Sequence, residues 1–152
     1  MKVDSGLLTT DLGTVAAHAQ ELEHLGYDGL LTAETNHDPF FPLLVAAEHT
    51  ERIELGTGIA VAFARNPMTL AQIGHDLQAY SHGRFILGLG SQIKAHIEKR
   101  FSMEWSHPAA RMREYVLALR AIWAAWAGGS DSRLTSCRRS SCGSRGTIRR
   151  SI

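Results

Sequence analysis

Four times in its first 128 residues, the chain repeats a short apolar run, a loop with glycine or polar residues, and a segment with helical apolar spacing. The apolar runs predict strands at residues 2–8, 27–32, 52–61 and 84–88. Strands that alternate with helices in this way form an α/β protein with a parallel sheet, either open and doubly wound or closed as a (β/α) barrel. The strand starts lie 25 to 32 residues apart, close to the roughly 31 residues per unit of an eight-unit barrel. Four units therefore amount to half a barrel, although an open four-stranded sheet has the same spacing.

The intervening helices are predicted from their end signals. Asp11 is a suitable N-cap for the first helix, and Pro39 suits the first turn of the second, because that turn needs no amide hydrogen there. Asn66 and Pro67 form an N-cap and first-position pair for a third helix that ends near residue 80. The fourth helix begins at Pro108, and its apolar and aromatic residues recur at helical spacing, which predicts packing rather than a ligand cage.

The composition of the chain changes at residue 128. Residues 1–128 contain all 11 aromatic residues and all eight histidines, with a net charge of −4, whereas residues 129–152 contain six arginines, one acid and no aromatic residue, with a net charge of +5. The overall charge of +1 is a cancellation between these two parts. Because the tail has few large apolar residues to offset its ordering entropy, we expect it to be disordered. Its two cysteines predict neither a disulfide framework nor a zinc site.

Several classes of protein are excluded. No apolar run approaches the roughly 18 residues of a membrane helix, and the first residues lack the pattern of a secretory signal, so we expect a cytoplasmic protein without a membrane partner. The motifs of zinc proteases, serine hydrolases and dithiol redox proteins do not occur in residues 1–128, and no metal site is predicted.

Two polar loops follow predicted strands, where active sites of parallel α/β folds gather. The loop after the second strand holds Glu34, His37 and Asp38, and a histidine beside carboxylates can act as a general acid or base. A simpler interpretation is that Asp38 or Asn36 caps the next helix while His37 is solvated.

The loop at residues 88–94 offers backbone amides, a hydroxyl and an amine that could hold phosphate or carboxylate oxygens, or it is only a tight turn. It matches neither the dinucleotide fingerprint nor the phosphate loop. Gly56 and Gly58, within an apolar strand, indicate a bulge or the close approach of another group.

A known family matches four segments, in order: residues 53–59, 66–67, 83–90 and 111–123. Together they resemble the bacterial luciferase-like monooxygenase superfamily, in particular its branch that uses the deazaflavin coenzyme F420. The resemblance covers about residues 1–127. It implies a (β/α)₈ barrel that binds F420, or alternatively FMN, at the C-terminal mouth, and an oxidoreductase that transfers hydride or electrons to or from a small organic substrate.

The resemblance also assigns site residues. In the family the third strand often has a bulge with a non-prolyl cis peptide, against which the coenzyme ring packs, and the loop after the fourth strand contacts the coenzyme. The loop after the second strand carries the acidic and histidine residues that handle a proton. The matching positions are Thr57, Gly58 and Ile59 for the ring, Gly90, Ser91 and Gln92 for polar contacts, and Glu34 and His37 for catalysis.

The chain departs from the family in two respects. Thr35 stands where many members have a histidine, and the family continues into strands five to eight where this sequence changes composition. We therefore hypothesise a frameshifted or truncated product, which is either still an enzyme or an inactive remnant that self-associates through its open sheet edges. A basic arm for nucleic acid or an acidic partner is the minor alternative for the tail.

Overall fold

The computed structural model describes residues 1–8 and 11–128, and there strands and helices alternate as predicted. The predictions for residues 129–152 lie outside the described residues. The strands are β1 (Asp4–Gly6), β2 (Gly29–Ala33), β3 (Glu54–Val61), β4 (Phe85–Ile86) and β5 (Leu89–Gly90). The helices are α1 (Leu12–His24), α2 (Phe40–His49), the 3₁₀ turn η1 (Ala62–Ala64), α3 (Pro67–Tyr80), α4 (Lys94–Arg100) and α5 (Pro108–Ala127).

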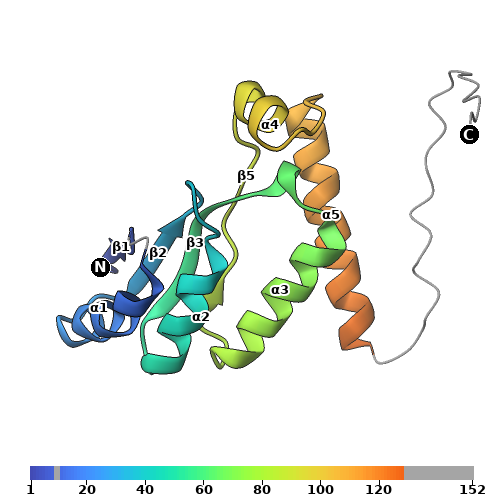
Figure 1. Ribbon diagram of the computed structural model, residues 1–152. Coiled ribbons are helices and arrows are strands. Elements are labelled where there is room, and N and C mark those ends of the chain that lie inside the picture. The colour runs from blue at the N-terminus through green and yellow to red at the C-terminus, as the bar shows by residue number, and fades with distance from the viewer. Residues whose placement is uncertain (9–10, 129–152) are drawn as a thin grey trace, which may run out of the picture.

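All strand pairs are parallel, as predicted, and the sheet order is β1-β2-β3-β4, with β5 also paired to β3. The long helices α1, α2, α3 and α5 follow one another along the sheet (Figure 1). None of the described helices is both long and apolar enough to span a bilayer. The arrangement is half of a (β/α) barrel, with β1 and β4 at its two edges.

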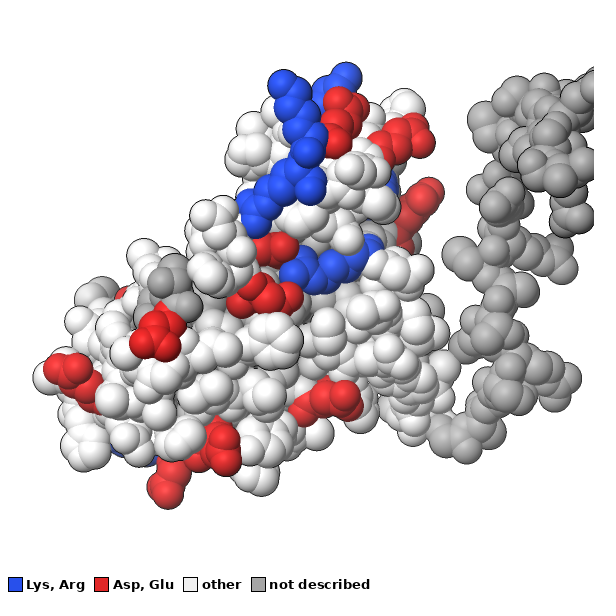
Figure 2. Space-filling model, in the orientation of Figure 1, with Lys and Arg blue, Asp and Glu red and all other residues white. Residues whose placement is uncertain are grey.

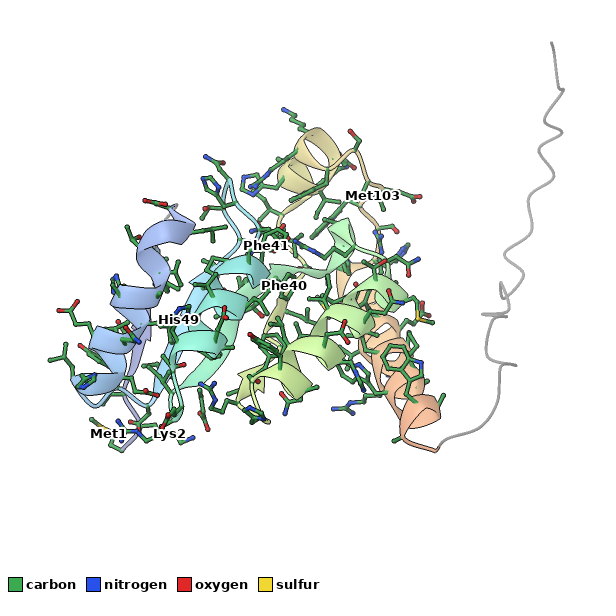
Figure 3. All side chains as sticks on the ribbon, turned by 60° about the horizontal axis from the view of Figure 1, so that its bottom comes forward. Met1, Lys2, Phe40, Phe41, His49 and Met103 are labelled. Carbon is green, nitrogen blue, oxygen red and sulfur yellow. The ribbon has the colours of Figure 1, made fainter. Side chains whose placement is uncertain are left out.

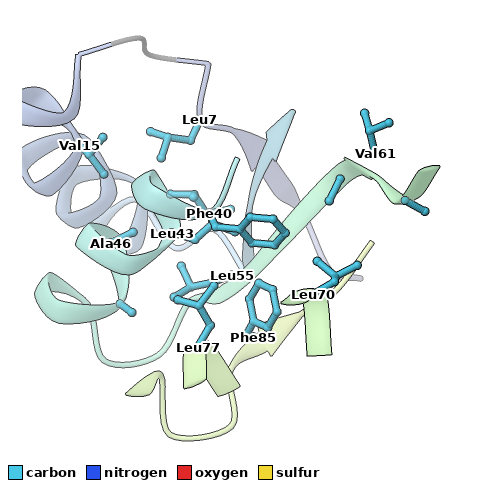
Figure 4. Close-up of a cluster of buried hydrophobic side chains, with 14 of the residues drawn as sticks. Leu7, Val15, Phe40, Leu43, Ala46, Leu55, Val61, Leu70, Leu77 and Phe85 are labelled. Carbon is cyan, nitrogen blue, oxygen red and sulfur yellow. The ribbon is translucent and has the colours of Figure 1, made fainter. Parts of the chain in front are cut away.

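The core lies between the sheet and the helices (Figure 4). Leu30, Leu55 and Phe85 are paired in register on neighbouring strands, and all three are buried. The rings of Phe85 and Phe40 are 6.5 Å apart, which joins β4 to the start of α2. Phe40 is only 5% exposed, whereas its neighbour Phe41 is 60% exposed, and both are labelled in Figure 3. Burial of one helix face against the sheet supplies the main stabilisation.

The other face of the sheet has no covering layer among the described residues. A Cβ atom on Gly56 would lie 2.7 Å from Cδ2 of Leu31 and 3.7 Å from Cβ of Ile86, so these three residues share that face. Ile86 is 51% exposed and Ile59 is 42% exposed. This face corresponds to the inside of a barrel, and its exposure is what the sequence predicts for half of one.

The N-caps are confirmed, but three details of the prediction are wrong. Asp11 accepts the amide of Gly13, and Asn66 accepts the amide of Met68, as predicted. The second helix starts at Phe40, because Pro39 is the cap residue and not the first turn. The single fourth strand is two short strands, β4 and β5, and neither η1 nor α4 was predicted.

Candidate functional site at the carboxyl edge of the sheet

A β-bulge lies in β3, as the two glycines predict. Thr32 of β2 pairs with Thr57, but the next residue, Ala33, pairs with Ile59, so Gly58 is the extra residue. Gly58 and Ile59 are exposed on the open face, and Thr57 is buried. The expected cis peptide is absent, since every peptide bond described here is trans. The extra residue alone accommodates the change of register.

The Thr57 side chain joins β3 to the following strand. Its hydroxyl donates to the carbonyl of Gly88 at 2.7 Å and accepts the amide of Gly88 at 2.8 Å. A side chain at residue 88 would overlap the carbonyl oxygen of Thr57, so only glycine fits there. These contacts replace regular ladder bonds, which explains why β4 and β5 are separate strands rather than the single strand predicted.

The loop after β5 lies directly beside the bulge. Gly90 pairs with Val61, and a Cβ atom on Gly90 would lie 2.7 Å from Cγ2 of Ile59. Ser91 and Gln92 follow with half-buried side chains. Gln92 has a φ of 59°, in the left-handed region that non-glycine residues rarely adopt, and its side-chain oxygen is 3.1 Å from Nδ1 of His96. The structure therefore brings together the two segments predicted to hold the coenzyme.

Glu34 lies at the same edge, where its amide donates to the carbonyl of Ile59 at 3.1 Å. Its side chain is only 5% exposed. The carboxylate oxygen Oε2 accepts the amide of Val61 at 2.7 Å and the Arg65 guanidinium nitrogen Nη1 at 2.5 Å. Two donors thus already engage this carboxylate, which favours a positioning role over proton transfer. The catalytic role of Glu34 stays a prediction.

Arg65 links Glu34 to Asp38, and the sequence analysis did not select it. The Arg65 nitrogen Nη2 is 3.0 Å from Oδ2 of Asp38, and Nη1 also donates to the carbonyl of Val61. The guanidinium lies 5.3 Å from the centre of the Phe40 ring. Burial lowers the pKa of the Arg65 guanidinium, but hydrogen bonds and charge from Glu34 and Asp38 outweigh it, so the pKa is raised. Arg65 therefore remains a permanent cation between two carboxylates.

His37 is exposed at the tip of the same loop, and among the described residues it has no hydrogen-bond or ion-pair partner. The simpler interpretation of Asp38 is confirmed in part, because its Oδ1 accepts the amide of Phe40 where α2 begins. The structure does not bring His37 into contact with the bulge. In the described part of the chain, no three His, Cys, Asp or Glu side chains gather as a metal site requires.

Tyr115 of α5 contacts the carboxyl edge of the sheet at Arg65. Its hydroxyl donates to the carbonyl of Arg65 at 3.1 Å. Burial raises the pKa of Tyr115 to about 12, although Arg65 and Arg111 act in the opposite direction. Two aromatic residues of the stripe pack against α3 rather than against the sheet: Trp123 donates to the carbonyl of Ala71, and the Trp126 ring lies edge-on to the His75 ring.

An aromatic cluster joins η1 to the loop between α4 and α5 and to the start of α5. The rings of Phe63, in η1, and Trp105 are 5.7 Å apart between centres. The guanidinium of Arg111 lies 4.4 Å from the centre of the Phe63 ring. Basic side chains also gather over α4 (Figure 2).

Sequence reasoning missed Arg65, and the signal that could have found it is a cation directly after a strand, opposite two acids in the neighbouring loop.

A parallel half barrel with a bulge, a glycine loop and an ion network at its carboxyl edge places the chain in one fold class, the (β/α) barrels, whose functional sites lie at the C-terminal mouth. The comparison with protein families identifies which one. Residues 2–136 match the luciferase-like monooxygenase family, and the chain belongs to it.

Curated relatives agree with this assignment. An uncharacterised protein of Mycobacterium tuberculosis is 64% identical over 130 residues, which are 86% of this chain and 38% of the relative. A putative coenzyme F420-dependent oxidoreductase of M. tuberculosis is 36% identical over 103 residues, which are 67% of this chain and 30% of the relative.

Solved structures match the fold. The monooxygenase RslO1 from Streptomyces bottropensis superposes with a TM-score of 0.72 and 26% identity, over 82% of this chain and 43% of that one. The F420-dependent tetrahydromethanopterin reductase from Methanopyrus kandleri gives a TM-score of 0.66 and 25% identity, over 75% and 38% of the two chains. The chain thus spans about two fifths of the length of the relatives it matches.

Proposed function

We propose that this chain carries the ring-binding half of an oxidoreductase site, in which F420 exchanges hydride with a small organic substrate. The observation that carries the proposal is the bulge at Gly58, which lies exposed beside Ile59 and the Gly90 loop at the carboxyl edge of a parallel sheet. That edge is where (β/α)-barrel enzymes hold their cofactors.

The residues present fit a flat ring. Gly58 has no side chain, Ala33 beside it has only a methyl group, and both are exposed, so a planar group can approach the backbone closely. Ile59, 42% exposed, offers an apolar surface for one edge of the ring. Ser91 and Gln92 provide a hydroxyl and an amide next to that surface, which suits the polar rim of a deazaflavin or flavin.

The remaining residues would orient the site and handle a proton. When bound, the coenzyme would supply the hydride chemistry, while the protein provides position and electrostatics. Glu34 fixes the amide of Val61 and the guanidinium of Arg65, and so holds the end of β3 in place. His37, exposed and without a partner in the described structure, is the free imidazole at this edge and the better candidate for proton transfer.

F420 is favoured over FMN by the relatives. The 36% identical mycobacterial protein and a 31% identical glucose-6-phosphate dehydrogenase from Intrasporangium calvum are both described as F420-dependent. The diketocamphane monooxygenase of Pseudomonas putida, solved with FMN, is only 16% identical, and this likeness supports the fold alone.

A binding experiment with matched variants tests the proposal. We expect the 152-residue chain to bind F420 saturably at micromolar concentration, measured by F420 fluorescence, and more tightly than FMN. Ile59→Ala should weaken binding about fivefold, which corresponds to roughly 1 kcal/mol of lost ring contact. Met68→Ala is the control, because Met68 is 41% exposed, like Ile59, but lies on α3. Equal affinities for the two variants, or no binding at all, would contradict the assigned ring site.

The alternative is an inactive remnant that self-associates. It is supported by the uncovered sheet face, where Ile86 is 51% exposed, and by the share of the relatives' length that the chain spans. Size-exclusion chromatography, together with the F420 titration, distinguishes the enzyme from the remnant. A polydisperse profile without F420 binding would favour the remnant, and a discrete species that binds F420 would favour the enzyme.

A further inference from the structure

Two strand edges of the half barrel lack partners in the described chain. β1 pairs only with β2, and β4 pairs only with β3, so the outer side of each has no neighbouring strand. Unpaired edges of this kind promote association, and barrels remove them by closure. Because all strands of this sheet are parallel, β4 of one copy can form a parallel pair with β1 of another copy.

The helix next to the β1 edge carries one acid on its outer side. α1 buries Val15, Ala19 and Leu22 against the sheet. At 100° per residue, His18 and Glu21 lie on the side of α1 opposite Glu23, whose carboxylate accepts the amides of residues 52 and 53 after α2, and the cap residue Leu25 follows the helix. Leu25 is 68% exposed, and Glu21 has no ion-pair partner among the described residues. Residues 1–28 as a whole contain five acids and one lysine, a net charge of −4.

The helix next to the β4 edge has a basic outer side. α5 packs on α3 through Trp123, which donates to the carbonyl of Ala71, and it buries Tyr115 and Leu119. The exposed side of α5 carries Arg113, Leu117 and Arg120, and Arg120 also lines the cavity between α3, α5 and β4. All three are exposed, Leu117 at 47%, and neither arginine has a charged partner in the part of the chain described. The helix has a net charge of +2.

We propose that two copies of this chain close into one eight-stranded barrel, related by a two-fold axis along the barrel. In this assembly β4 of each copy pairs with β1 of the other, and α5 lies beside α1 of the other copy. The contact brings Arg113 and Arg120 toward Glu21, and Leu117 toward Leu25. The same contact forms twice, so the two-fold assembly leaves no open edge.

A cavity at the same flank agrees with this occupant. It has a volume of about 680 Å³ and lies between α3, α5 and the β4 edge, where it is lined by apolar residues that include Leu87, Leu89 and Trp123. The β1 side of a second copy would bring Leu8, which is 74% exposed, to the uncovered flank. The proposal does not depend on coenzyme binding, because it concerns the edges of the sheet and the outer sides of α1 and α5.

Charge reversal tests the arrangement directly. Sedimentation velocity of the full chain should give a discrete species of twice 16.7 kDa. The double variant Arg113→Glu, Arg120→Glu and the single variant Glu21→Arg should each weaken dimerisation at least tenfold, since like charges then meet in both contacts. Mixing the two variants should restore the dimer, because both contacts again join opposite charges. Glu48→Arg and Lys99→Glu, at exposed positions elsewhere, are the matched controls and should dimerise like the parent chain.

Three results would overturn the proposal. These are a monomeric parent chain, an open-ended series of oligomers, or charge-reversed variants whose mixture stays monomeric. A monomeric chain that forms a one-to-one complex with the C-terminal part of the 64% identical M. tuberculosis relative would assign the same edges to that partner instead.

Discussion

The two ends of the sheet hold their charged side chains in different ways. At the carboxyl edge, the Arg65 guanidinium forms side-chain ion pairs with both Glu34 and Asp38. At the amino edge, Glu23 and Arg84 are satisfied mainly by the backbone. The carboxylate of Glu23 accepts the amides of residues 51, 52 and 53 at 2.6 to 3.2 Å. Arg84 donates to the carbonyls of residues 47, 50, 53 and 81 at 2.9 to 3.0 Å.

This difference matches the division of labour in barrel enzymes. Backbone partners fix loops, so the amino edge serves stability, whereas side-chain partners can be exchanged for a ligand, so the carboxyl edge can serve chemistry. Arg84 is part of the sequence pattern that resembles the family, and its contacts hold the end of α2 and the start of β3. Substitutions at the two edges should therefore have separable effects.

The largest effect is expected at Arg65. Arg65→Met leaves the carboxylate of Glu34, which is 5% exposed, without its cationic partner, and should lower the free energy of unfolding by about 3 kcal/mol. Urea denaturation at one fixed protein concentration measures this change. Adding Glu34→Gln should recover about half of the loss, because no unpaired charge is then buried. Additive losses in the double variant would contradict direct coupling of the two side chains.

An intermediate effect is expected at Arg84. Arg84→Met removes the donor to several carbonyls of the amino edge and should lower the free energy of unfolding by about 2 kcal/mol, since water can reach some of these groups afterwards. F420 affinity should stay unchanged, because the site proposed for F420 lies at the opposite edge. Lys2→Met serves as the control, since the ion pair of Lys2 with Glu54 is exposed and its loss should leave the urea midpoint unchanged. Loss of F420 binding in a folded Arg84→Met protein would refute the separation of the two edges.

What the sequence predicts well at either edge is local chemistry. The caps at Asp11 and Asn66 and the bulge at Gly58 each depend on residues close in the chain, so a short motif specifies them. The family resemblance adds the fold, because its motifs span most of the described residues.

What the sequence does not predict depends on distant contacts. Glu34 and Arg65 are 31 residues apart, so no local motif specifies their pairing, and the cation after β3 points to the two acids only once the strands are placed side by side. The division of the fourth strand arises from hydrogen bonds between Thr57 and Gly88, which are also 31 residues apart. The helix α4 has only seven residues, too few for a periodic apolar pattern to identify it.

The smallest effect is expected at Glu23, and it differs from the others in its pH dependence. Burial raises the pKa of Glu23, but the amides of residues 51 to 53 and the charge of Arg52 outweigh it, so the pKa is lowered. The folded protein therefore binds fewer protons than the unfolded chain in mild acid. The stability from Glu23 is present above the ordinary glutamate pKa of the unfolded chain, and it is lost as the pH falls through the lower pKa of the folded state. Glu23→Gln should cost under ~1 kcal/mol at neutral pH, because solvent screens a partly exposed carboxylate. Below that window the urea midpoints of parent and variant should converge. A constant difference between them down to the acid limit would show that Glu23 acts through packing and not through its charge.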